Sequence, residues 1–361
     1  MVFIDELPWM ATPRSGFLTA FEAFWNGWAA GQDNIFLIVC GSATSWIIDN
    51  LLTDYGGLYD RSSHSIRLEP FTLAECEAYE DARGSMRSRD EILRGYMIFG
   101  GIPYYWKLLD PELSLPQNID ALFFSSTGTL RKEFDALYAS VFRNHKLHIR
   151  TVKALFGKRG GMSRAEVLKA LGMQSGGNIT KVLTDLEESG FIVSYRPVGT
   201  SEDVYMLTDF YTLFYYRFVE DNKSPDPNTW SNLQNTPAIN NWHGLTFEIV
   251  CLAHSMQIRQ ALQFAGIQSK EILYRSSTAQ IDLLFDRADR TVVICEMKYT
   301  QEPYALTASD DEKLRSRIAE LRPYFHANTS YKVAFVVPYG IMRGKNASLV
   351  AGQVKLDDLF K

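Results

Sequence analysis

The sequence lacks long apolar runs, a secretory leader and closely spaced cysteines. No stretch reaches the roughly 18 consecutive apolar residues that a membrane-spanning helix needs. The N-terminus has no basic segment followed by an apolar one, so it does not read as a signal peptide. The cysteines are scattered, which fits reduced, buried thiols better than disulfides or a zinc site. These absences predict a cytoplasmic protein with no membrane contact. The four cysteines are Cys40, Cys76, Cys251 and Cys295.

The chain has little excess charge overall, but its basic residues are concentrated in one segment. The 361 residues carry a formal net charge of -5, which by itself does not suggest a nucleic-acid-binding protein. Between Val141 and Thr200, however, ten lysines and arginines stand against four acidic residues, a local net charge of +6. Because local charge governs contact with phosphates, this segment is where we expect a DNA-binding surface.

Two apolar segments near the N-terminus predict a strand, a helix and a second strand. Residues 2–6 read VFIDE, and residues 35–42 read IFLIVCGS, which predicts a strand buried on both faces of a parallel sheet. Between them, aromatic residues recur at helical spacing over about residues 17–30. A strand that ends in an acidic pair, here Asp5 and Glu6, is typical of the Walker B motif. In that motif the Asp holds nucleotide-bound Mg²⁺ and the Glu orients water.

Further motifs follow in a fixed order. Ser42 or Thr44, just after the second strand, is where a γ-phosphate sensor would lie. Residues 58–61 read LYDR, residues 68–71 predict a strand leading into Pro-Phe, and residues 100–105 read GGIPYY. Together with the acidic pair, these motifs resemble the archaeal-type ATPases of the AAA+/STAND class.

That resemblance implies a particular α/β architecture. It implies a P-loop-type parallel-sheet domain with a helical lid, a winged helix, and a C-terminal domain of the PD-(D/E)xK nuclease-like kind. Arg61 would be a phosphate-sensing or finger arginine; the alternative is that Arg61 merely pairs with a nearby acid. Defence or mobile-element roles are implied by the resemblance alone.

The sequence departs from this family at one point, because GxxxxGK[ST] occurs nowhere in it. That loop supplies the backbone amides and the lysine that cradle the phosphates of a nucleotide. We therefore expect no ATPase activity from these residues alone, and ATP with Mg²⁺ only if the missing loop is supplied. Either the chain is a fragment of a larger ATPase or the ATPase half has been lost. In both cases the remaining sheet should expose an edge to a protein partner or a second copy.

The basic segment reads as a winged helix-turn-helix. Apolar spacing predicts a helix over residues 147–156, a capping box opens a second helix over 163–171, and a third helix runs over 178–189. Two strands, at 191–196 and 203–208, then form a hairpin. In such a fold the third helix can enter the major groove. The residues that we expect to face DNA are Lys158, Arg159, Arg164, Ser175, Asn178, Thr180, Lys181 and Thr184. The alternative is a winged helix that only packs against other domains.

The C-terminal segment carries acidic residues on strand-like runs. After a linker at residues 223–240, a long helix over about 242–264 contains Glu248 among apolar neighbours, where a charge needs a partner or a metal. A hairpin with a three-residue loop centred on Asp289 would pair Phe285 with Val293 and would place Asp282 opposite Glu296. Lys298, two residues further on, would share the face of Glu296.

Asp282, Glu296 and Lys298 thus resemble the PD-(D/E)xK nuclease signature, with Glu248 as a further acid. Oxygen ligands from Asp282 and Glu296 suit Mg²⁺, and Lys298 can stabilise charge or orient water. Two alternatives stay open: a Mg²⁺-dependent DNA-processing protein, and a non-enzymatic remnant with a degenerate nuclease fold that binds DNA or a protein.

The predicted organisation has four parts. They are a partial AAA+ ATPase domain with helical lid over residues 1–140, a winged helix over 141–222, a linker over 223–240 and a nuclease-like domain over 241–361.

Overall fold

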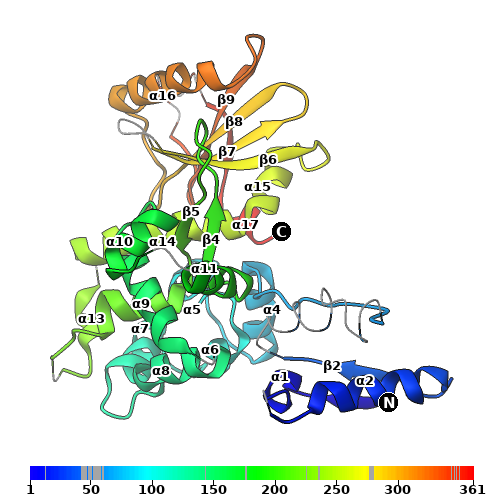
Figure 1. The fold of residues 1–361 in the computed structure, drawn as a ribbon. Coiled ribbons are helices and arrows are strands. Elements are labelled where there is room, and N and C mark those ends of the chain that lie inside the picture. Colours follow the sequence, from blue (N-terminus) through cyan, green and yellow to red (C-terminus); the bar gives the residue numbers. More distant parts are fainter. Residues whose placement is uncertain are drawn as a thin grey trace.

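The computed structural model shows a mixed α/β protein, whose described residues form three sheets and many helices (Figure 1). No helix in the described part of the chain is long and apolar enough to cross a membrane. The structure describes residues 1–361 except 13, 42–46, 48–50, 52–57, 59–60, 143, 175–176, 225, 235, 276–279, 343, 345, 347 and 349.

The N-terminal residues form a small parallel unit. Strand β1 (Val2–Ile4) pairs in parallel with β2 (Leu37–Val39), and helix α2 (Phe17–Gly27) connects them after the short helix α1 (Leu7–Met10). The predicted order of strand, helix and strand is therefore correct. The unit has its own apolar cluster, in which Phe21 and Trp25 of α2 pack.

The burial predicted for this unit is wrong. The segment at 35–42 was expected to be buried on both faces, but β2 is only half-buried and Phe36, just before it, is 62% exposed. Phe24 and Trp28, two of the aromatic residues of the helical pattern, are exposed as well. Within the described residues this sheet has two strands, which are too few to enclose an apolar strand. Large apolar side chains therefore reach solvent here.

The predicted strand at residues 68–71 is also absent, since residues 61–72 form no strand. Ile66 and Leu68 are exposed, so burial of these two side chains does not favour a strand. The segment is held instead at its end, where Phe71 and Gly101 share a backbone hydrogen bond of 2.7 Å. A Cβ on Gly101 would lie 1.9 Å from the carbonyl oxygen of Phe71, so only glycine permits this approach.

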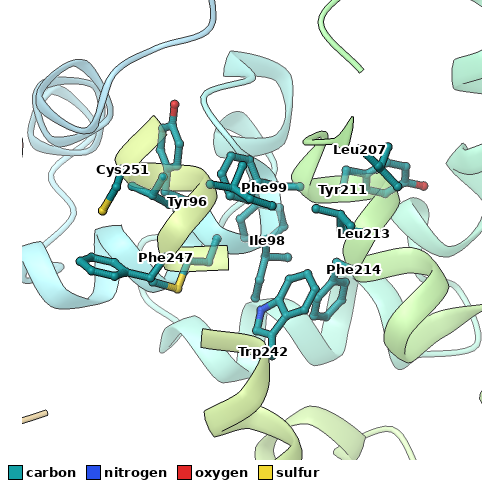
Figure 2. Packing of buried hydrophobic residues seen from close by; sticks show 14 of the residues in the cluster. Tyr96, Ile98, Phe99, Leu207, Tyr211, Leu213, Phe214, Trp242, Phe247 and Cys251 are labelled. Carbon is teal, nitrogen blue, oxygen red and sulfur yellow. The ribbon is translucent and has the colours of Figure 1, made fainter. Parts of the chain in front are cut away.

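Helices fill the middle of the chain and share one large core with later segments of the chain. Figure 2 shows Tyr96, Ile98 and Phe99 packing with residues of two later helices, including Phe214 and Trp242. The core is therefore continuous between segments far apart in sequence. The helices from residue 73 to residue 141 are α4 (Leu73–Ala82), α5 (Arg89–Phe99), α6 (Pro103–Lys107), α7 (Leu115–Ile119), the π-helix η3 (Asp120–Phe124) and α8 (Thr129–Val141).

Residues 145–207, here called the α9–β5 unit, form three helices and a small antiparallel sheet. The sheet order is β3-β5-β4, and the β4–β5 hairpin extends toward the C-terminal sheet (Figure 1). The apolar residues of the third helix, Ile179, Val182, Leu183 and Leu186, are all buried. The elements are α9 (His145–Phe156), β3 (Met162–Ser163), α10 (Arg164–Leu171), α11 (Gly177–Glu188), β4 (Ile192–Tyr195) and β5 (Val204–Leu207).

The expected linker at residues 223–240 is largely folded. It contains α13 (Thr229–Leu233) and the start of α14 (Pro237–Ala253), and Trp230 is only 3% exposed. The buried carboxylate of Asp120 accepts hydrogen bonds from the backbone N–H groups of Trp230 at 2.7 Å and Ser231 at 3.0 Å. The polar residues of this segment instead form turns around a buried tryptophan. Helix α12 (Phe210–Phe214) and the π-helix η4 (Tyr215–Val219) precede this segment.

The predicted long helix at 242–264 is broken into two. Helix α14 ends at Ala253, and α15 (Ser255–Ala261) begins after His254. The ring of His254 is fully buried. The backbone N–H of Leu73, far away in the chain, holds the ring at this break.

The C-terminal domain is a five-stranded sheet between helices. Its order is β10-β9-β8-β7-β6, with antiparallel pairing from β6 to β8 and parallel pairing from β8 to β10. Helix α16 covers one face through Leu314 and Leu321, and α14, α15 and α17 cover the other (Figure 1). The elements are β6 (Ser269–Arg275), β7 (Gln280–Arg287), β8 (Thr291–Met297), α16 (Ala308–Leu321), η5 (Arg322–Tyr324), β9 (Ser330–Val336), β10 (Val350–Val354) and α17 (Leu356–Leu359).

Candidate functional site

The β7–β8 hairpin has the register that the sequence predicts. Phe285 pairs with Val293, and the last pair is Arg287 with Thr291, which leaves a three-residue loop centred on Asp289. Arg290 closes the loop with a φ of 58°, the left-handed conformation that such loops use. The hairpin therefore brings Asp282 of β7 to the end of β8, where Glu296 lies.

A β-bulge in β7 decides where Asp282 points. Against β6, Ile272 pairs with Leu284 but Tyr274 pairs with Ile281, so three steps along β7 match two along β6. Ile281 and Leu284 consequently face the same apolar cluster, although residues three apart in a regular strand face opposite sides. The extra residue turns Asp282 toward the backbone N–H of Met297, which donates to its carboxylate at 3.1 Å.

Glu296 is buried and held by two cations. Its Oε1 lies 2.6 Å from Nζ of Lys298, and its Oε2 pairs with the guanidinium of Arg317 on α16. Only 5% of Glu296 is exposed, so both cations replace water that the carboxylate has lost. Sequence reasoning missed Arg317, because it lies on a surface helix with several charged residues and no signal marks it.

Glu248, on α14, is joined to a residue from a different part of the chain. Its Oε1 lies 2.6 Å from Nη2 of Arg159, in the turn between α9 and β3. The sequence predicted that a charge among apolar neighbours needs a partner, and Arg159 is that partner. Arg159 was predicted to lie near DNA phosphates, and the structure places it against a carboxylate instead.

The charges at this site perturb one another. Burial, followed by the negative charges of Glu248 and Glu296, raises the pKa of Asp282 to about 7, against the effect of the Met297 N–H and Lys298. Burial also raises the pKa of Glu248, although Arg159 opposes the shift. Burial works against the charge of Lys298, but the neighbouring Glu296 outweighs it and raises the pKa of Lys298. The pKa of Asp282 is thus raised into the neutral range by its burial and by two neighbouring carboxylates.

The residues fit one kind of metal site and not another. Among the described residues, no three His, Cys, Asp or Glu side chains are placed to hold one metal ion. A closed site with three protein ligands, including Glu248, therefore does not fit. Mg²⁺ in proteins is usually held by one or two carboxylates with several waters. A site of that kind fits Asp282 and Glu296, whose carboxylates lie at adjacent strand ends.

A cavity of about 90 Å³ lies between the α9–β5 unit and the C-terminal domain. Lys158 and Arg159 line it on one side, and Glu248 and Asp282 line it on the other. A cavity needs roughly 10–15 Å³ of this kind of volume to hold one water molecule, so there is room for several water-sized groups. Basic and acidic side chains that we expected to act separately therefore face one space.

The structure divides the predicted DNA-contact residues between two places. Lys158 and Arg159 belong to the cavity just described, and Lys158 pairs with Glu166 at 2.6 Å. On α11 the side chains expected to face DNA are exposed, and Thr180 accepts a hydrogen bond of 2.9 Å from Arg164. Ser175 lies outside the described residues. The exposed side chains of α11 that were expected to face DNA are Asn178, Thr180, Lys181 and Thr184.

The predicted nucleotide-binding residues are only partly described. Asp5 follows β1, and its carboxylate accepts a hydrogen bond from the thiol of Cys40 at the end of β2. Glu6 follows in the left-handed conformation, with a φ of 48°. Arg61 is exposed. Ser42 and Thr44 lie outside the described residues.

Comparisons with known proteins return distant likenesses. No protein-family model matches the chain, and no curated protein matches it. A Walker-type ATPase of Pyrococcus abyssi aligns over 60% of this chain and 63% of its own, with 17% identity and a TM-score of 0.43. The restriction endonuclease FokI aligns over 58% of this chain and 42% of its own, with 13% identity and a TM-score of 0.22.

The matched region spans less than two thirds of either protein. The two belong to the classes named by the sequence resemblance, an ATPase and a nuclease.

Proposed function

We propose that residues 241–361 form a nuclease-like domain that binds Mg²⁺ and acts on DNA phosphodiesters. The observation that carries this proposal is the meeting of Asp282, Glu296 and Lys298 at the ends of β7 and β8, with the pKa of Asp282 raised to about 7. Perturbed carboxylates that converge beside a lysine are typical of functional sites. The bulge in β7 supports the same reading, because bulges often re-aim a side chain next to an active site.

Each residue has a role in this proposal. Asp282 and Glu296 hold Mg²⁺, which would polarise the scissile phosphate when bound. Lys298 stabilises negative charge on the phosphate or orients the attacking water. Asp282 must give up its proton before it binds a cation, so binding should strengthen as the pH rises through about 7.

We further propose that the α9–β5 unit is a winged helix that contacts DNA. Two observations support it: the exposed polar face of α11 and the local net charge of +6. The hairpin of β4 and β5, which would be the wing of this fold, packs against the C-terminal domain. Val198, in the loop between these strands, lies against the apolar cluster of Tyr274 and Leu321. DNA contact therefore rests on α11 and the residues beside it.

The N-terminal unit is proposed to be part of an ATPase domain of the AAA+/STAND class. The parallel pairing of β1 with β2 and the position of Asp5 at the end of β1 support this. ATP with Mg²⁺ would bind only where a phosphate-binding loop is supplied to Asp5, Glu6, Ser42 and Arg61. The exposed apolar side chains of this unit favour a protein partner or a second copy at the edge of the sheet.

The experiment that tests the nuclease-like site is calorimetric titration with Mn²⁺ or Mg²⁺. The full chain is compared with the double variant Asp282→Ala/Glu296→Ala, and with Glu312→Gln as a control on the exposed side of α16. Micromolar to millimolar binding that is lost only in the double variant supports the proposal and justifies cleavage assays. Wild type that binds neither metal would refute it.

A second candidate function is non-enzymatic binding of DNA or a protein. It is favoured by the ion pairs of Glu296, whose two oxygens are both held by cations, Lys298 and Arg317. A carboxylate satisfied in this way has less to gain from a metal ion. DNA binding by wild type without any metal binding would favour this function.

A further inference from the structure

Three cations pair with the carboxylates of the site in the described part of the chain, and one of them comes from outside the C-terminal domain. Lys298 and Arg317 pair with Glu296 from within that domain. Arg159 reaches Glu248 from the α9–β5 unit. Arg159 is thus the cation whose position depends on how the two parts of the chain meet.

The turn that carries Arg159 is built to present it. The backbone N–H of Gly161 donates to the carbonyl oxygen of Lys158 at 2.8 Å, and the hydroxyl of Tyr195 donates to the carbonyl oxygen of Gly160 at 2.7 Å. Gly161 has a φ of +76°, and a Cβ there would lie 2.5 Å from the carbonyl oxygen of Tyr205. Arg159 therefore projects from a turn that is fixed on both sides, and only its long side chain is free to change partner.

The guanidinium of Arg159 is reachable from solvent, while the carboxylate that it binds is mostly covered. The side chain of Arg159 is 50% exposed and that of Glu248 is 23% exposed. The cavity beside them also contains Lys158 and Asp282. An anion that approaches this cavity meets the two basic residues before it meets the carboxylates.

We propose that Arg159 exchanges Glu248 for a DNA phosphodiester and so couples DNA contact to metal binding at Asp282 and Glu296. The inference rests on the proposed function, because it requires a cation at that site. Guanidinium groups bind phosphate in the same two-pronged way in which they bind carboxylate, so the exchange costs Arg159 little. It leaves Glu248 unpaired beside Asp282, which makes the site more negative and more attractive to a divalent cation.

The coupling works in both directions. DNA that takes Arg159 tightens metal binding, and a bound metal ion favours the arrangement in which Arg159 is free for DNA. In the absence of DNA, the pair of Arg159 with Glu248 keeps the cation affinity of the site low. The cation affinity of the site would then rise where a DNA phosphodiester is present.

The test is calorimetric titration of the full chain with Mn²⁺, with and without a short DNA duplex, at a pH above the pKa of Asp282. Arg159→Gln removes the charge, and Arg159→Lys retains a cation. Lys153→Gln is the matched control. Lys153 pairs with Glu220 at 2.6 Å, and the side chains of this pair are about as exposed as those of Arg159 and Glu248, but the pair does not reach the C-terminal domain. Thermal unfolding of each variant checks that it is folded.

We expect Arg159→Gln to bind Mn²⁺ about tenfold more tightly than wild type without DNA, because one positive charge beside the site is gone. The duplex should tighten Mn²⁺ binding by wild type, Arg159→Lys and Lys153→Gln, but not by Arg159→Gln. Equal Mn²⁺ affinity of wild type and Arg159→Gln would overturn the exchange and leave the metal site standing. Failure of every variant to bind Mn²⁺ would refute the metal site, and the exchange with it.

Discussion

The ring of His254 accepts a hydrogen bond from the backbone N–H of Leu73, with 2.9 Å between Nε2 and the nitrogen. Its other nitrogen, Nδ1, lies 2.8 Å from the carbonyl oxygen of Val250 and must donate to it. A ring that donates through Nδ1 and accepts through Nε2 is neutral. The contact joins the start of α4 to the junction of α14 and α15, and it exists only while His254 remains unprotonated.

Stability should therefore fall as the pH drops below the ordinary pKa of histidine. Burial lowers the pKa of His254 and lowers the pKa of His243 to about 4. The unfolded chain then binds protons that the folded chain does not, so stability is lost between about pH 6.5 and pH 4, by up to about 3 kcal/mol for His243. Urea unfolding across this range measures the loss.

The control for this effect is the comparison of two variants. His243→Gln/His254→Gln should show a shallower pH dependence than wild type, whereas His64→Gln, at an exposed position, should match wild type. An unchanged slope in the double variant would contradict the assignment of the effect to these two rings.

Asp282→Asn should stabilise the fold and abolish metal binding at the same time. The pKa of Asp282 is raised to about 7, so the ionised carboxylate is less stable in the folded protein than in the unfolded chain. The free energy of unfolding therefore falls as the pH rises from 3.8 to about 7. At a pH above 7, removing the charge should add about 1–3 kcal/mol to the free energy of unfolding, and near pH 3.8 it should add little. Thermal unfolding at both pH values, beside Mn²⁺ calorimetry, checks both effects. A loss of stability at high pH would show that the carboxylate is needed by the fold.

Asp120→Ala should loosen the segment around α13. The carboxylate of Asp120 accepts the backbone N–H groups of Trp230 and Ser231, and the side chain is buried. Removing it leaves buried donors without a partner, which costs about 1–3 kcal/mol. Chemical unfolding measures the loss, and Asp81→Ala at an exposed position of α4 should cost far less. Equal effects of the two variants would mean that the segment at 223–240 is not held by Asp120.

Gly101→Ala should be among the most destabilising small substitutions in the helical part. Its Cβ would lie 1.9 Å from the carbonyl oxygen of Phe71, so the backbone itself must move, at a cost of about 2 kcal/mol or more. Gly244→Ala is the matched control, because nothing lies within 4 Å of a Cβ at that position of α14. We expect that control to be neutral or to stabilise by up to about 1 kcal/mol. A tolerated Gly101→Ala would mean that the Phe71 contact is not needed for folding.

Local signals account for the elements that were predicted correctly. The β7–β8 register follows from alternation on two strands and a short loop, all within about twenty residues. The capping box at Ser163 and the apolar spacing of α11 determine helices in the same local way. The strand predicted at 68–71 failed because a strand requires a neighbour to pair with, and the sequence contains no record of whether one is present.

By itself, then, the sequence determined the helices of the α9–β5 unit and the register of the β7–β8 hairpin, which brings Asp282 near Glu296 and Lys298. Periodicity and turn length act over a few residues, so they can be read in order along the chain. Only the tertiary structure decided that a bulge turns Asp282 toward Met297 and that Arg159, rather than solvent, meets Glu248. These contacts join residues far apart in sequence. Burial and charge there depend on how whole elements pack, which no local pattern records.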